Sequence, residues 1–167
     1  KAQFGDKAEE FLGFFSHPAT KESLEKEGFL HAIGFAIRAA CRMNAKNGVA
    51  QPLYAYNFDA EIPGWDNPGT FHSVDLWFFF ETLAKCWRPF TGKHYDLART
   101  MCDYWVNFIR TGDPNGVDSQ GHNLPLWPEM KDADPAWTVF GDRAQPERWP
   151  MGKLEAFLLE QYLKKNG

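Results

Sequence analysis

The spacing of apolar residues along this chain predicts helices separated by glycine and proline. A short helix is expected over residues 5–15 and a longer one over 20–48, where Gly48 stands in the position of a C-terminal cap. Apolar residues recur at helical spacing in the longer segment: Leu30, Ile33, Ile37, Ala40 and Cys41. The first third of the chain is therefore expected to be helical.

A strand is predicted over residues 52–58, "PLYAYNF", because apolar side chains occupy both alternating faces. Strands of this kind lie inside sheets that are covered on both sides, so an inner strand is expected. The polar stretch 59–71 contains two Pro-Gly pairs and is expected to form a loop. This loop leads directly to His72.

Two further helices are predicted after His72. The first spans 73–87, with Ser73 as its N-cap, and the second spans 94–111 and stops at Gly112. Their expected buried faces are Leu76, Phe79, Phe80 and Leu83 in the first, and Leu97, Met101, Tyr104, Trp105, Phe108 and Ile109 in the second.

A short strand at 137–140 and a last helix marked by Leu154, Phe157, Leu158 and Tyr162 complete the expected elements. Helices that flank a few strands indicate an α/β layered architecture.

The composition adds that this chain has more apolar surface than a domain of its size would cover alone. Of its 167 residues, 44% are hydrophobic and seven are tryptophan. Some of that surface is expected to face another segment or subunit. The net charge of −4, without runs of lysine or arginine, argues against a nucleic-acid partner. No stretch approaches the roughly 20 apolar residues of a membrane span. A neutral or hydrophobic ligand fits better.

His72 has two readings from the residues alone. A loop past the end of an inner strand is where open α/β sheets place groups that handle ligands, and an imidazole suits proton transfer near neutral pH. In the alternative reading, His72 fills a structural hydrogen bond in its loop. Both remain open at this point.

Metal binding is not expected. The other histidines, His17, His31, His94 and His122, show no ligand spacing, and "DPNGVD" at 113–118 is interpreted as a turn and not as a calcium loop. The three cysteines are interpreted as buried free thiols: Cys41, Cys86 and Cys102.

The run "QPLYAYNFDAEIPGWDNPGTFHSVDLWFFFETLAKCWRPFTGKHYDLARTMCDYWVNFIRTGDPNG" closely resembles the C-terminal part of type B carboxylesterases, the family of cholinesterases, fungal lipases and bacterial p-nitrobenzyl esterases. "LPLWPEM", "VFGD" and "FGDKAEEFL" extend the resemblance over nearly the whole chain. It implies an α/β-hydrolase fold. Residues 1–167 would supply the last core strands and flanking helices of a single domain, completed by a missing N-terminal segment or chain.

The resemblance assigns His72 as the general base of a Ser-Glu/Asp-His triad, acting without metal or cofactor. Asp75 matches the acidic residue that follows the family's histidine. We expect Asp75, with Ser73, to support His72 and not to be the triad acid. Phe71, Val74 and Trp77 would line a possible substrate pocket.

The triad nucleophile is absent from this sequence. Its serines are Ser16, Ser23, Ser73 and Ser119, and none lies in a G-x-S-x-G motif. The implied partner is an N-terminal fragment or chain that carries this serine and the triad acid, and the implied substrate is a small ester. The alternative is a non-catalytic, neuroligin-like adhesion or scaffold protein. The chain has no N-x-S/T glycosylation acceptor, which favours the esterase, and a cytoplasmic over a secreted location.

Overall fold

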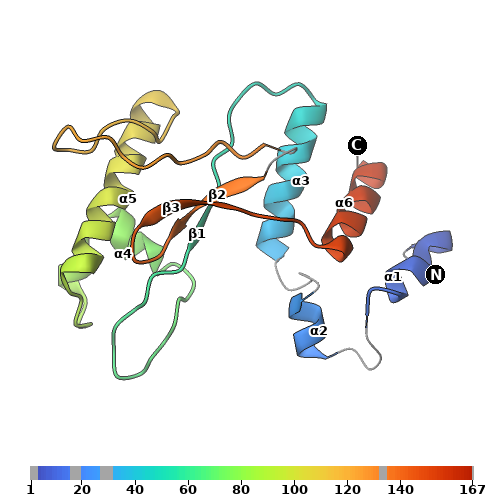
Figure 1. Ribbon diagram of the computed structural model, residues 1–167, viewed down its shortest axis with the longest axis horizontal. Helices are drawn as coiled ribbons and strands as arrows, with labels where there is room; N and C mark the ends of the chain where they lie inside the picture. The colour runs from blue at the N-terminus through green and yellow to red at the C-terminus, as the bar shows by residue number, and fades with distance from the viewer. Residues whose placement is uncertain (1–3, 16–19, 27–31, 132–134, 167) are drawn as a thin grey trace. The chain divides into compact units, whose positions relative to one another are not determined.

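The computed structural model describes residues 4–15, 20–26, 32–131 and 135–166 (Figure 1). These residues belong to two compact units. The first is helical and is built from the two ends of the chain, and the second contains the sheet. By residue number, the first unit takes 1–51, 131–135 and 149–167, and the second takes 52–130 and 136–148.

The helical unit follows the predicted pattern with one interruption. A 3-10 turn at Gly5–Lys7 leads into the first of four helices: α1 (Ala8–Leu12), α2 (Lys21–Lys26), α3 (Ala32–Lys46) and α6 (Lys153–Asn166). The helix expected over 20–48 is thus found as α2 and α3. Residues 27–31, with the predicted core position Leu30, lie outside the described residues.

Gly48 caps α3 as predicted. Its φ of +67° is one that glycine adopts without steric cost. In this conformation the Gly48 amide donates to the Ala45 carbonyl at 3.3 Å, and the Val49 amide donates to the Asn44 carbonyl at 2.9 Å. These two bonds satisfy carbonyls that the end of a helix would otherwise leave without partners.

Aromatic side chains hold the short N-terminal helix against α6. Phe4 stacks on Phe11 with ring centroids 4.4 Å apart, and both rings, with Phe14, lie around Phe157 of α6. Leu154 and Phe157 are buried as predicted, whereas Leu158 is half-buried and Tyr162 is exposed. The buried face of α6 instead continues through Leu159.

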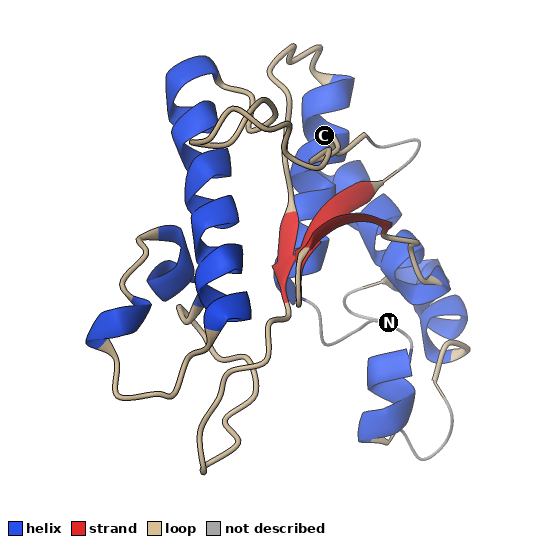
Figure 2. Cartoon of the chain, turned by 60° about the vertical axis from the view of Figure 1, so that its left-hand side comes forward, coloured by secondary structure: helices blue, strands red, loops and turns tan. Residues whose placement is uncertain are grey.

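The second unit contains the sheet, drawn in red in Figure 2. The sheet has three strands in the order β1-β2-β3. β1 (Tyr56–Phe58) runs parallel to β2 (Ala136–Phe140), which pairs antiparallel with β3 (Ala144–Arg148). The strand predicted at 137–140 is confirmed as β2. The strand predicted over 52–58 is found as the shorter β1, which lies at an edge of the sheet that the described residues form. That it becomes an inner strand, with neighbours from a missing segment, stays a prediction. Apolar alternation shows which faces are covered and does not show which edges are paired.

The sequence did not predict β3. Three of the residues in "AQPER" are polar or charged, and Pro146 lacks the amide that a central strand needs. β3 is an edge strand, where proline is tolerated.

The helix predicted over 73–87 is wrong in its length. The structure has α4 (Asp75–Phe79), an irregular turn and a 3-10 segment at Leu83–Lys85. Within the turn, Glu81 adopts a φ of +49°, and the Thr82 amide reaches back to the Trp77 carbonyl at 2.9 Å. That bond replaces the helical pattern and ends α4 early. Cys86 therefore follows a 3-10 turn and is not in a helix as expected.

The helix α5 (Gly92–Thr111) confirms the clearest sequence pattern. Gly112 closes it with a φ of +78°, as predicted. At its other end, the Thr91 hydroxyl and the His94 ring form a reciprocal cap with each other's backbone amides. α5 packs on α4 and against the sheet, and together they enclose a core around Tyr104, Trp127 and Phe140.

Part of each predicted helical face is exposed in this chain. Phe80 is 60% exposed and Ile109 is 75% exposed, and Leu76 and Phe108 are also exposed. The helical period correctly indicated an apolar face, but the described part of the chain does not cover all of that face. Among the described residues, no helix is both long and apolar enough to cross a membrane.

Candidate functional site

His72 lies at the end of a loop that leaves the sheet at the carboxyl end of β1. The loop starts next to β2, where the Asp59 amide donates to the Phe140 carbonyl at 2.9 Å. Ala60 and Ile62 are buried in the core, whereas His72 itself is exposed. The sheet thus anchors the first part of the loop and leaves the imidazole accessible at its end.

Ser73 contacts the imidazole directly. Its hydroxyl oxygen lies 2.6 Å from His72 Nδ1, and it donates or accepts according to the ring tautomer. Ser73 has a φ of +69°, which is uncommon for a residue with a side chain. The prediction that Ser73 is an N-cap is wrong: the position before α4 is Val74, and it makes no side-chain capping bond. The Ser73 side chain bonds to the histidine and does not bond to the helix.

Asp75, in the first turn of α4, accepts a hydrogen bond from the Tyr56 hydroxyl at 2.7 Å. Burial and this bond to a carboxylate raise the pKa of Tyr56 well above its usual range, because both disfavour a phenolate. Asp75 therefore ties the helix that follows His72 to the strand that precedes the loop.

The three predicted pocket residues separate into two environments. The rings of Phe71 and Trp77 meet edge to face with centroids 5.7 Å apart, and Phe71 is exposed. Val74 is buried in the core and presents no surface to a ligand in this chain. Phe71, which precedes His72 in the chain, thus forms an apolar wall with Trp77.

The sequence analysis missed Arg88, which holds the middle of the loop. Its guanidinium makes two parallel bonds to the Asp66 carboxylate, each 2.9 Å long, and a third to the Pro63 carbonyl at 3.1 Å. Hydrogen bonding to this cation lowers the pKa of Asp66 below its usual range. No short-range motif marks the pair, because its members stand 22 positions apart.

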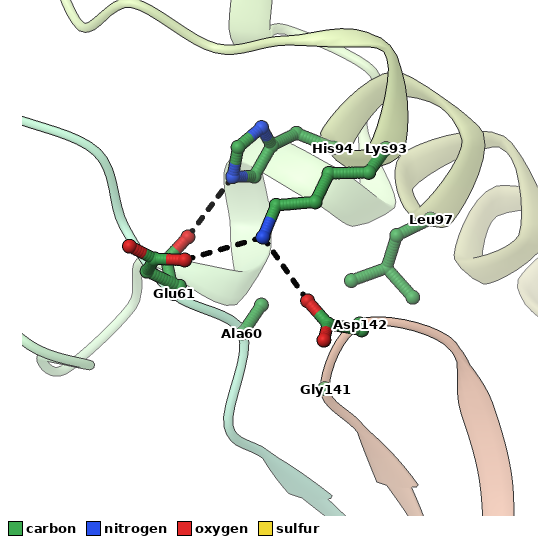
Figure 3. A pocket seen from close by; sticks show the side chains of 7 residues that line it. All are labelled: Ala60, Glu61, Lys93, His94, Leu97, Gly141 and Asp142. Atoms are coloured by element: carbon green, nitrogen blue, oxygen red, sulfur yellow. Dashed lines mark hydrogen bonds and ion pairs between the residues drawn. The ribbon is translucent and has the colours of Figure 1, made fainter.

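A second polar cluster holds the start of the loop (Figure 3). Lys93 bridges the carboxylates of Glu61 and Asp142 at 3.2 and 3.1 Å. His94 is buried, and its Nδ1 accepts from the Thr91 amide at 3.0 Å. Its Nε2 therefore carries the proton and donates to the Glu61 carbonyl at 3.1 Å. The sequence T-x-x-H at 91–94 was the available signal for this cap.

The space inside this second cluster is too small for a substrate. Its cavity of about 10 Å³ has room for one water molecule. No group of three or more side chains within the described residues is arranged to hold a metal ion. His17 and His31 lie outside those residues, and His122 pairs with Asp118 at 3.3 Å on the surface. Cys41 is buried, and Cys86 and Cys102 are half-buried free thiols.

When this chain is compared with protein families and with known proteins, the matches include esterases and a related hydrolase. A sequence profile described as "Carboxylesterase family" matches residues 28–155. Phenmedipham hydrolase of Pseudarthrobacter oxydans is 32% identical over 112 residues, which cover 62% of this chain and 22% of that protein. Human cocaine esterase is 29% identical over 133 residues, which cover 75% of this chain and 22% of that protein. The chain thus spans about a fifth of the length of these relatives.

A solved esterase from Clostridium hathewayi superposes on 98% of this chain and 31% of its own length, with a TM-score of 0.58 and 23% identity. That esterase can hydrolyse aliphatic aromatic polyesters. At this identity the likeness concerns the fold alone, which this chain shares with about a third of that longer protein.

Proposed function

This chain belongs to the carboxylesterase family and has the fold of an α/β-hydrolase segment, and from this premise we propose that it supplies the histidine of a serine esterase. The observation that carries the proposal is the position of His72. It is an exposed imidazole on the loop that follows the carboxyl end of a parallel strand, where α/β-hydrolases place the last member of their triad.

In the proposed reaction, His72 first accepts a proton and then donates it. Its ring takes the proton from a serine hydroxyl while that oxygen attacks the ester carbonyl carbon, and then returns the proton to the leaving alkoxide. Water repeats the sequence to release the acid. In the complete protein Nε2 is proposed to face the serine and Nδ1 to donate to the triad acid, so the Ser73 hydroxyl, 2.6 Å from Nδ1 in this chain, would share that nitrogen or give way to the acid.

The serine and the triad acid are proposed to come from an N-terminal segment or chain. The 167 residues contain no G-x-S-x-G, and the match covers 22% of phenmedipham hydrolase. That segment would complete one domain with both units described above. The proposed substrate is a small carboxylic ester, and the apolar wall of Phe71 and Trp77 fits its uncharged groups. The proposed chemistry requires no metal and no cofactor.

The test is the substitution His72→Ala in the complete protein. We expect kcat to fall by at least about 10³ while KM changes little, because proton transfer is lost and binding is retained. In the unaltered enzyme, kcat/KM should rise with pH through a limb near about 7, as an imidazole loses its proton.

His122→Ala is the matched control, because His122 is an exposed histidine of the same unit. It should leave kcat unchanged. Full esterase activity in the His72→Ala variant would refute the assignment. A complete protein that lacks serine at the centre of its G-x-S-x-G would instead support the adhesion or scaffold alternative.

A further inference from the structure

We propose that Arg88 is a positioning residue for His72, and that it acts by holding the 59–71 loop in one shape. The proposal rests on the role of His72 as general base. Arg88 lies 16 positions after His72, beyond α4, and its partners lie before His72 in the chain. It therefore connects the two sides of the histidine segment.

The guanidinium holds two positions of the loop at once, one through a side chain and one through the backbone. Its fork meets both oxygens of Asp66, and Nη1 also donates to the Pro63 carbonyl. The side chain of Arg88 is only 7% exposed, whereas that of Asp66 is 32% exposed. A planar donor group engaged on two edges leaves the intervening turn little freedom.

The turn between these two positions is built closely around the guanidinium. A Cβ on Gly64 would stand 2.5 Å from both Arg88 Nη1 and Asp66 Oδ1. That distance is shorter than non-bonded carbon contacts allow, so any side chain at 64 would push the pair apart. A side chain at position 64 would therefore displace the Arg88–Asp66 pair.

Arg88 also contacts the residue next to His72. The centre of its guanidinium lies 5.8 Å from the Phe71 ring centroid and 4.6 Å from the ring of Trp87. Phe71 in turn packs on Trp77, and its carbonyl accepts from the Val74 amide at 3.1 Å. Movement of Arg88 is thereby transmitted to the backbone on both sides of the imidazole.

Arg88 has a small part in the core of this unit. The bonds of Arg88 go to the loop, to the partly exposed Asp66 and to the Pro63 carbonyl, and not to the strands or to α5. The start of the loop has its own attachment through His94 and Glu61. Loss of the guanidinium should therefore disturb the position of His72 more than it disturbs the fold.

The experiment compares variants of the complete esterase. Arg88→Gln should lower kcat roughly 10- to 100-fold, because a misplaced general base loses that much, with KM changed less than about threefold. Its thermal midpoint should stay near that of the unaltered protein. Arg88→Lys keeps the charge without the fork and should recover only a small part of kcat. Arg99→Gln is the control, because its ion pair with Glu81 is exposed and 4.0 Å long.

Gly64→Ala provides a second route to the same effect, because it displaces the ion pair and leaves Arg88 intact. It should show the same fall in kcat with little change in KM. If His72→Ala is inactive but Arg88→Gln and Gly64→Ala both keep kcat within about twofold, this inference fails and the proposed function stands. A fall in kcat that only matches the lost fraction of folded protein would also overturn it. Full activity of His72→Ala would refute both the proposed function and the inference about Arg88.

Discussion

Arg38 in the helical unit and Arg88 in the sheet unit have the same kinds of partner and different effects. Each pairs with a carboxylate, donates to backbone carbonyls and lies over a tryptophan ring. Arg38 meets Glu155 at 2.8 Å and donates to the Trp149 carbonyl at 2.7 Å, 111 positions away. The hydrogen-bonded partners of Arg88 lie 22 and 25 positions away in one loop.

This difference in sequence separation shows what each arginine stabilises. The Arg38 side chain is 2% exposed and joins α3 to α6, which come from opposite ends of the chain. Its burial lowers its pKa, and the carboxylate of Glu155 opposes that change. Arg38 therefore stabilises the fold of its unit, whereas Arg88 sets the shape of one loop.

The largest effect on stability is expected from Arg38→Gln. It leaves the Glu155 carboxylate buried without its cation, which costs about 3–5 kcal/mol in comparable buried pairs. Chemical denaturation should show this loss, while kcat per folded molecule stays unchanged. The double variant Arg38→Gln, Glu155→Gln should recover part of it, because no unpaired charge remains. Equal losses in the single and double variants would contradict the buried ion pair.

A smaller loss of about 1.5–3 kcal/mol is expected from Tyr56→Phe, which removes a hydrogen bond to a carboxylate. The pKa of Tyr56 is raised in the fold. Its stabilisation is therefore complete below the ordinary tyrosine pKa of about 10, and is lost as the pH rises above it. Unfolding measured at pH 8 and pH 11 should show a smaller alkaline loss in Tyr56→Phe than in the unaltered protein. An identical alkaline loss would exclude this bond as the cause.

The smallest expected effect is a change in the pKa of one carboxyl group, that of Asp66. Hydrogen bonds from Arg88 are the main cause that lowers this pKa. The ion pair is thus present above the ordinary aspartate pKa and is lost as the pH falls through the lowered value. Carbon-13 NMR should show the Asp66 pKa rising toward the ordinary value in Arg88→Gln. Asp118 is the internal control, because backbone amides of His122 and Gln120 lower its pKa. Parallel shifts of both carboxyl groups would show a general change and not a local one.

Sequence patterns predicted the elements that depend on local chemistry. Gly48 and Gly112 end their helices as expected, because the left-handed cap is a property of a few adjacent residues. α5 was predicted in the same way, because the spacing of its apolar residues lies within one continuous segment. The length of α4 was overestimated, because an apolar run gives no sign of the positive φ of Glu81 or of the bond from the Thr82 amide to the Trp77 carbonyl.

In the candidate site, too, local features were predicted and contacts between distant residues were not. His72 was found because its loop and its resemblance to the family lie in one continuous stretch. The contact between Ser73 and the ring could not be read from sequence, since a serine before a helix ordinarily indicates a cap. Arg88 was missed because its partners lie more than 20 positions before it. For His94, the T-x-x-H spacing indicates the cap with Thr91, but the bond to Glu61, 33 positions away, has no local signature.

The two edges of the sheet have opposite capacities to accept another strand. Beyond β3, the Trp149 amide donates to the Pro135 carbonyl at 2.9 Å, so strand alternation turns the Pro146 nitrogen outward, where it offers no donor. Glu147 and Arg148 add charge to that strand. β1 carries Tyr56, Asn57 and Phe58 and no proline. An additional strand is therefore expected to pair with β1 and not with β3. This holds for a strand of the missing segment and for a strand exchanged between two copies of this chain.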